Sequence, residues 1–148
     1  MTDPVIKTID VPCSPARAFD VFVRNTARWW PLDRHSVSAG QGQTARDLTI
    51  EPRVGGAIYE TTHDGARSDW GEVLEFAEGS HFAMTWHPGN PVAQATRLDI
   101  RFTELSADRT RVELTHSGWE VLADDAETRR DGYNNGWNGV LDAYQAAL

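Results

Sequence analysis

The sequence predicts an α+β fold, an antiparallel sheet with helices on one side, and three observations support it. Between residues 48 and 119, apolar residues recur with the period of two that is typical of strands, in short runs separated by turn residues. Residues 131–148 instead carry apolar side chains at helical spacing. A short strand and two short helices precede the sheet. Strands joined by short turns form an antiparallel meander, so the predicted order is strand, two helices, meander and long C-terminal helix.

The first elements have clear boundaries. Residues 5–11 alternate well enough to predict a strand. Ser14 then has the residue type of a helix N-cap, Pro15 stands at the first helical position, and residues 18–23 supply an apolar face. A second short helix should end just before Pro31, because proline disfavours helical geometry in the residue that precedes it.

A polar loop and the meander follow. The segment from Leu32 to Ala45 is long for a loop in a compact domain, which indicates that it is functional or mobile. Among the turns after it, Asp64 followed by Gly65 is the strongest hairpin signal. We expect the strands of the meander at residues 48–50, 58–62, 70–76, 82–86, 96–105 and 111–119.

The final helix carries an aromatic face beside a strip of small residues. Its glycines Gly132, Gly136 and Gly139 should together cost roughly 3 kcal/mol of helix propensity, whereas each large side chain that is buried returns about 1.5–3 kcal/mol. Tertiary packing must therefore hold this helix. The small residues either let the backbone approach the sheet or leave a cavity where the helix stands off. The apolar face consists of Tyr133, Trp137, Val140, Leu141, Tyr144 and Leu148.

Length, charge and cysteine content exclude several classes of protein. The 148 residues suffice for one domain with its own core, at residues 1–148. A net charge of −8 argues against nucleic-acid and anionic-membrane binding, since both need clustered Lys and Arg. Cys13, the single cysteine, permits no internal disulfide, and we expect it to be buried rather than reactive. No secretory signal or bilayer-spanning run is present, so we expect a cytoplasmic location.

Several short motifs occur in order along the chain. They are Ser14 and Pro15 with Ala18 to Phe22, the Trp29–Pro31 triplet, Gly55 and Gly56 after Pro52, Gly71 to Val73, Thr85 and Trp86, His116 to Trp119, and Gly136 and Trp137. In this order and spacing they resemble the helix-grip fold of the START and birch-pollen-allergen superfamily, SRPBCC. Within it they are most similar to the branch named after the activator of heat-shock-protein-90 ATPase. The resemblance covers essentially the whole chain.

This resemblance implies that the sheet, with six to seven strands, curves around the C-terminal helix and leaves a deep, mostly apolar cavity between them. It implies less about chemistry. The superfamily includes lipid and hormone binders, polyketide aromatases and cyclases, oxygenase domains and a co-chaperone, and a shared fold does not choose among them. Three functions stay open: binding of a small hydrophobic or aromatic molecule, a cyclase, aromatase or hydrolase reaction, and a chaperone-accessory role. A chaperone or a second copy of the chain is a possible partner.

His116 is the most conspicuous polar residue of the sheet, because strand parity places it in an apolar row on the inner face. Three roles are open for it. It is a core histidine whose nitrogens bond to a hydroxyl or backbone group, or a polar contact for a ligand in the cavity, or a general acid or base. Glu60 and Glu72 are its candidate catalytic partners if a bulge turns either of them inward. The sequence predicts no metal site and no cofactor, since neither metal-ligand spacing nor a nucleotide-binding motif occurs.

Aromatic residues are the strongest evidence for a pocket, since apolar cavities with a few placed polar groups hold small organic ligands. The alternative is that the same side chains fill the core. We predict that the Leu32–Ala45 loop gates the pocket and that its lining consists of Trp30, Tyr59, Trp70, Trp86, Phe102, His116, Trp119, Tyr133 and Trp137.

Overall fold

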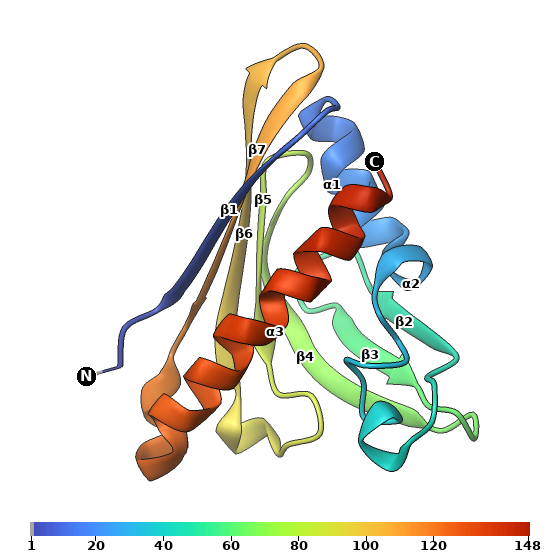
Figure 1. Ribbon diagram of the computed structural model, residues 1–148, viewed down its shortest axis with the longest axis vertical. Helices are drawn as coiled ribbons and strands as arrows, with labels where there is room; N and C mark the ends of the chain where they lie inside the picture. The colour runs from blue at the N-terminus through green and yellow to red at the C-terminus, as the bar shows by residue number, and fades with distance from the viewer. Residues whose placement is uncertain (1) are drawn as a thin grey trace.

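The computed structural model describes residues 2–148 and contains a sheet of seven strands in the order β1-β7-β6-β5-β4-β3-β2. Every neighbouring pair is antiparallel. Figure 1 shows the sheet curling so that β2 and β3 turn toward the side on which the helices lie. The strands are β1 (Val5–Val11), β2 (Asp47–Ile50), β3 (Ala57–Thr61), β4 (Arg67–Ala77), β5 (His81–Trp86), β6 (Thr96–Ser106) and β7 (Arg109–Ser117).

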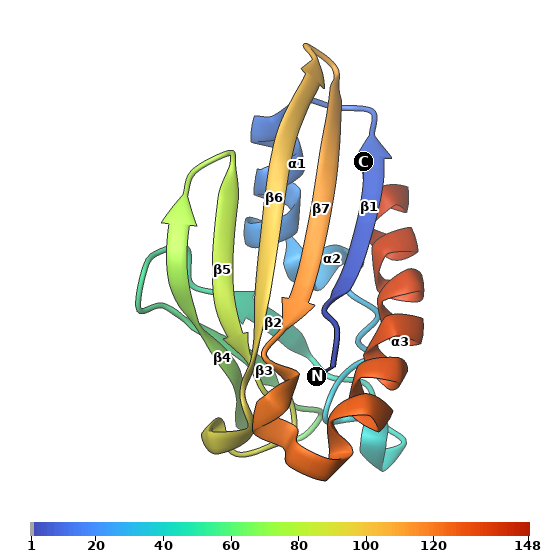
Figure 2. The ribbon, with the colours of Figure 1, turned by 90° about the vertical axis from the view of Figure 1, so that its left-hand side faces the viewer.

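The helices cover the inner side of this sheet, and the longest of them crosses it diagonally (Figures 1 and 2). The predicted α+β fold, with two short helices after the first strand and a long C-terminal helix, is therefore confirmed. The α-helices are α1 (Pro15–Arg24), α2 (Thr26–Trp29) and α3 (Ala126–Ala146), and short 3-10 helices occur at η1 (Ala39–Gln41), η2 (Val92–Gln94) and η3 (Trp119–Asp125).

The N-terminal end of α1 and the C-terminal end of α3 are both held by specific contacts. The Ser14 hydroxyl accepts a hydrogen bond from the Arg17 backbone N–H at 3.3 Å, which confirms the predicted N-cap. Phe19 is fully buried, a burial that contributes about 1.5–3 kcal/mol. The hydroxyl of Tyr144 donates to the backbone carbonyl of Ala18 at 2.6 Å, so the end of α3 is fixed against α1.

Two details near the ends of the sheet follow from local residues. Cys13 is buried, as predicted, and burial raises the pKa of its thiol. The last strand ends at Ser117, earlier than predicted, because Gly118 adopts a φ of +80° and turns the chain out of the sheet. Trp119 consequently begins η3 and does not extend β7.

A β-bulge in β4 turns Trp70 toward the interior. The register between β3 and β4 shifts between Ile58 and Tyr59, which leaves Trp70 as the extra residue. A Cβ atom built on Gly71 would lie 1.9 Å from the carbonyl oxygen of Thr85. The close approach of β4 to the end of β5 therefore requires glycine at this position.

We expect Gly71→Ala to lower the free energy of unfolding by about 2–3 kcal/mol, because the added methyl group forces the two strands apart. Urea denaturation measures the change. Gly139→Ala in α3 is the control: a Cβ there meets no atom within 4 Å, and alanine should stabilise the helix by about 1 kcal/mol. A Gly71→Ala protein as stable as the wild type would contradict the close approach.

Candidate functional site

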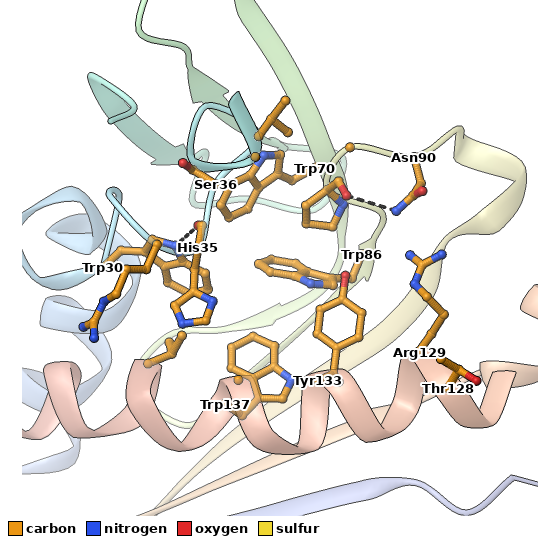
Figure 3. A pocket seen from close by; sticks show the side chains of 18 residues that line it. Trp30, His35, Ser36, Trp70, Trp86, Asn90, Thr128, Arg129, Tyr133 and Trp137 are labelled. Atoms are coloured by element: carbon orange, nitrogen blue, oxygen red, sulfur yellow. Dashed lines mark hydrogen bonds between the residues drawn. The ribbon is translucent and has the colours of Figure 1, made fainter. Parts of the chain in front are cut away.

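A pocket of about 550 Å³ lies between residues 128–140 of α3, the loop after α2, the start of β4 and the end of β5 with the turn that follows it (Figure 3). Eighteen residues line it, and they come from four separate segments of the chain. They are Trp30, Arg34, His35, Ser36, Val37, Gly40, Trp70, Trp86, Pro88, Gly89, Asn90, Thr128, Arg129, Gly132, Tyr133, Gly136, Trp137 and Val140.

Four tryptophans form one continuous wall of the pocket. Trp30, Trp70, Trp86 and Trp137 have ring centroids 5.3–5.9 Å apart, in tilted or edge-to-face arrangements. Each of them is at most 7% exposed. Tyr133 extends this wall along α3, with its ring stacked 6.4 Å from that of Trp137. Each ring thus packs against at least one other ring, and together they form one aromatic surface.

The helix α3 lies close to α1 and the sheet near its C-terminus and stands off near its N-terminus. Leu141 and Tyr144 are buried, whereas Gly132 and Gly136 border the pocket. A Cβ atom on Gly136 would lie 3.5 Å from Cε1 of His35, and one on Gly132 would meet no atom within 4 Å. The pocket thus occupies the space that the small residues of the helix leave open.

His116 links two of the pocket tryptophans through a chain of hydrogen bonds. The Trp137 indole N–H donates to Nδ1 of His116 at 3.1 Å, so Nδ1 is the acceptor and Nε2 carries the proton. Nε2 lies 2.6 Å from the Thr96 hydroxyl, which in turn donates to the backbone carbonyl of Trp86 at 3.1 Å. Burial lowers the pKa of His116 to about 3, so the imidazole is neutral near pH 7.

His116 bonds to neither Glu60 nor Glu72, the two carboxylates that the sequence suggested as its catalytic partners. Both ring nitrogens of His116 are already occupied by Trp137 and Thr96. Glu72 is exposed on the outer face of the sheet. Glu60 does point inward, as the prediction allowed, but its carboxylate binds other groups. His116 acts as a structural link behind the pocket and does not line it.

Glu60 fastens the loop after α2 to the sheet. Its fully buried carboxylate accepts hydrogen bonds from the backbone N–H groups of Val37 and Ser38, at 2.7 and 3.0 Å. The Ser38 hydroxyl, at 2.8 Å, and the Trp70 indole N–H, at 3.2 Å, complete its partners. A buried carboxylate needs such donors to offset the loss of its hydration. The loop is therefore a wall of the pocket, and gating by this loop stays a prediction.

Three other residues predicted for the pocket lie outside it. Tyr59 is on the outer face of the sheet, where the Arg67 guanidinium lies 4.0 Å from its ring centre. Phe102 packs in the aromatic core beneath α1. Trp119 packs on the ring of His116, with the two centroids 4.1 Å apart. The pocket contains Trp30, Trp70, Trp86, Tyr133 and Trp137 of the predicted set.

Several lining residues were not predicted. Arg34 and His35 come from the loop after α2, and Asn90 comes from the turn after β5. Burial, aided by the neighbouring charge of Arg34, lowers the pKa of His35. Arg129 lies one helical turn before Tyr133, so helical spacing alone was a signal that could have identified it. The loop residues have no comparable signal, because their placement depends on the contacts of Glu60.

The neutral His116 makes stability depend on pH. Its folded-state pKa of about 3 lies below the ordinary value of 6.5, so between these values the unfolded state binds more protons. The contribution of His116 is fully present above about pH 6.5 and falls with decreasing pH by up to about 1.4 kcal/mol per unit. Urea denaturation between about pH 5 and 7.5 should show this slope, and His116→Asn should lose it. Burial also lowers the pKa of His35, which adds a slope of the same sign, so the assignment rests on the part of the slope that His116→Asn removes. Identical slopes in wild type and His116→Asn would contradict it.

We expect Glu60→Gln to loosen the loop after α2, because the amide replaces one acceptor oxygen with a donor that faces backbone N–H groups. The free energy of unfolding should fall by about 1–3 kcal/mol. Hydrogen exchange of the backbone amides of residues 31–45 should become faster in line with this loss of stability. Glu72→Gln, on the outer face of the neighbouring strand, should leave both properties unchanged. Equal exchange in the two variants would show that Glu60 does not hold the loop.

Within residues 2–148, no helix is both long enough and apolar enough to cross a membrane. In the same described residues, no three His, Cys, Asp or Glu side chains come close enough together to hold a metal ion.

Solved structures with the same fold include proteins of diverse roles. An anthrahydroquino-gamma-pyrone synthase, Txn09, in complex with SUM, is 26% identical, with a TM-score of 0.64 over 99% of this chain and 97% of that one. The Aha1 dimer from Colwellia psychrerythraea is 17% identical, with a TM-score of 0.71 over 99% and 96%. CalC, a self-sacrificing resistance protein from Micromonospora echinospora, is 19% identical, with a TM-score of 0.71 over 98% and 93%.

A comparison with curated proteins finds no match. The family model described as activator of Hsp90 ATPase homolog 1-like protein matches residues 12–148, from just before α1 to the end of α3. This range contains six of the seven strands and all the residues that line the pocket. The chain belongs to the activator of Hsp90 ATPase homolog 1-like family, a branch of the SRPBCC superfamily.

Proposed function

We propose that the protein binds a small aromatic or hydrophobic molecule in the pocket beneath α3. The observation that carries the proposal is the wall of Trp30, Trp70, Trp86 and Trp137, which borders an open space and does not fill it. A volume of about 550 Å³ lies within the range of small-molecule sites. Flat ligands gain both buried area and ring contacts from such a wall.

One relative favours a role in small-molecule chemistry. Txn09, whose identity to this chain is 26% over nearly the full length of both, is named as a synthase of an anthrahydroquino-gamma-pyrone. CalC is named as a resistance protein, and at 19% identity it supports the fold alone. A chaperone partner and a homodimer, which the family resemblance implies, stay predictions, although the Colwellia relative was solved as a dimer.

The polar groups near the pocket fit ligand binding without a chemical reaction better than they fit catalysis. Both ring nitrogens of His116 bond to protein groups, and the carboxylate of Glu60 is occupied by four donors. General acid or base catalysis requires a titratable group within reach of the substrate. In this arrangement neither His116 nor Glu60 is free for that task, and Glu72 is exposed on the outer face of the sheet.

Gly132→Leu tests the proposal, because a leucine at this position projects into the mouth of the pocket. Quenching of tryptophan fluorescence by methylanthraquinone, confirmed by calorimetry, should be saturable in the wild type. The affinity should fall by at least about tenfold in Gly132→Leu. Gly139→Leu is the matched control, since it adds the same side chain to the same helix at a position outside the pocket, with no atom within 4 Å of the new Cβ.

The control should bind the probe as the wild type does, and both variants should be at least as stable as the wild type because leucine favours helix over glycine. Absence of saturable binding by any member of a panel of polycyclic aromatic and lipid probes would overturn the proposal. Equal affinity in the two variants would place the binding site elsewhere.

A further inference from the structure

The pocket differs in charge from the rest of the protein. The chain carries a formal net charge of −8, yet Asp and Glu are absent from the eighteen described residues that line the pocket. Arg34 and Arg129 are both among them. Arg34 lies 3.9 Å from the exposed carboxylate of Asp33, whereas Arg129 has no ion-pair partner within residues 2–148. An unpaired guanidinium at an apolar pocket favours a ligand with negative charge.

One buried hydrogen-bond donor in this pocket has no partner in the described protein. The indole N–H of Trp86 is buried and unpaired, and the Trp86 side chain is 5% exposed. The indole N–H groups of the other tryptophans all donate: Trp29 to Val21, Trp30 to His35, Trp70 to Glu60, Trp119 to His116 and Trp137 to His116. Leaving a buried donor unpaired costs about 1–3 kcal/mol, so such a group indicates a missing acceptor.

Two further donors lie beside Trp86. Figure 3 shows the hydroxyl of Tyr133 directed toward Trp86, with the guanidinium of Arg129 on the same side of the pocket. Burial raises the pKa of Tyr133, although the charge of Arg129 and the N–H groups of Arg129 and Trp86, which face the hydroxyl oxygen, act in the opposite direction. The hydroxyl therefore keeps its proton and can donate it in a hydrogen bond. Trp86, Tyr133 and Arg129 together form a group of donors, which we call the donor corner.

We propose that the ligand is a planar aromatic molecule with an anionic oxygen, and that this oxygen accepts hydrogen bonds from Trp86 and Tyr133 while Arg129 neutralises its charge. The proposal rests on the proposed function and adds the chemical class of the ligand. An aryl carboxylate and a phenolate present the same charged oxygen, so both belong to this class. The tryptophan wall binds the rings, and the donor corner orients them.

Four probes with the same three-ring skeleton separate the contributions in the wild-type protein. Methylanthracene has no acceptor, methylanthraquinone has neutral carbonyl acceptors, and anthraquinone carboxylate and hydroxyanthraquinone, the latter assayed in its ionised form, carry an anionic oxygen. We expect affinity to rise along this series, with the better of the two anionic probes binding about tenfold more tightly than methylanthraquinone, because a charge-assisted bond replaces a neutral one. The order of the two anionic probes identifies the carboxylate or the phenolate as the better fit.

Variants of the protein test which residues cause these differences in affinity among the probes. Arg129→Gln should abolish most of the preference for the anionic probes, measured as the ratio of their affinity to the affinity for methylanthraquinone in the same variant. Arg101→Gln is the control: it removes the same charge from the outer face of β6, away from the pocket. Trp86→Phe keeps an aromatic ring without the N–H and should abolish the preference for methylanthraquinone over methylanthracene.

The outcomes distinguish the two proposals. Equal affinities for all four probes would overturn the anionic ligand class while leaving the proposed function in place. An anionic preference that persists in Arg129→Gln, or a quinone preference that persists in a folded Trp86→Phe protein, would also overturn it. Failure of every probe to bind the wild type would overturn the proposed function and this inference with it.

Discussion

The hydrogen-bond chain from Trp137 through His116 and Thr96 to the backbone of Trp86 is the constraint on which the pocket depends. It joins α3 to β7, β6 and β5 in the interior of the protein. Each bond contributes about 1 kcal/mol net, but removing one partner leaves buried polar atoms unpaired at a larger cost. The imidazole must stay neutral, because a charged ring would lose its acceptor nitrogen and the bond from Trp137.

A second buried group, the carboxylate of Glu60, acts from the opposite wall. It would be costly to bury alone, and its four donors come from the loop after α2 and from Trp70. The loop contributes His35 and Val37 to the lining, so the position of one carboxylate decides the shape of that side. The buried side chains of His116 and Glu60 thus hold the aromatic wall of the pocket in place. The donors of the donor corner are not used in these contacts.

Much of this architecture could be predicted because it follows from local patterns. Helical and strand periods identified the order of elements, and parity placed His116 inside, where the structure has it. Five pocket aromatics were also identified from the sequence. Tyr59 was placed in the pocket although alternation with Ile58 puts it on the outer face of the sheet. The inward turn of Trp70 depends on a bulge, which is a property of two paired strands. The contribution of His35 and Asn90 to the pocket lining could not be predicted from the sequence, because it arises where loops distant in sequence meet.

The packed tryptophans have an optical consequence. Ring centroids 5.3–5.9 Å apart bring the transition dipoles of Trp30, Trp70, Trp86 and Trp137 close enough to couple. Their tilted and edge-to-face arrangement is chiral, so the coupled transitions give an exciton couplet in the circular dichroism spectrum. Excitation also migrates among these rings, which means that a ligand in contact with one indole affects the emission of all of them. The same packing that shapes the pocket therefore also couples its four indole chromophores.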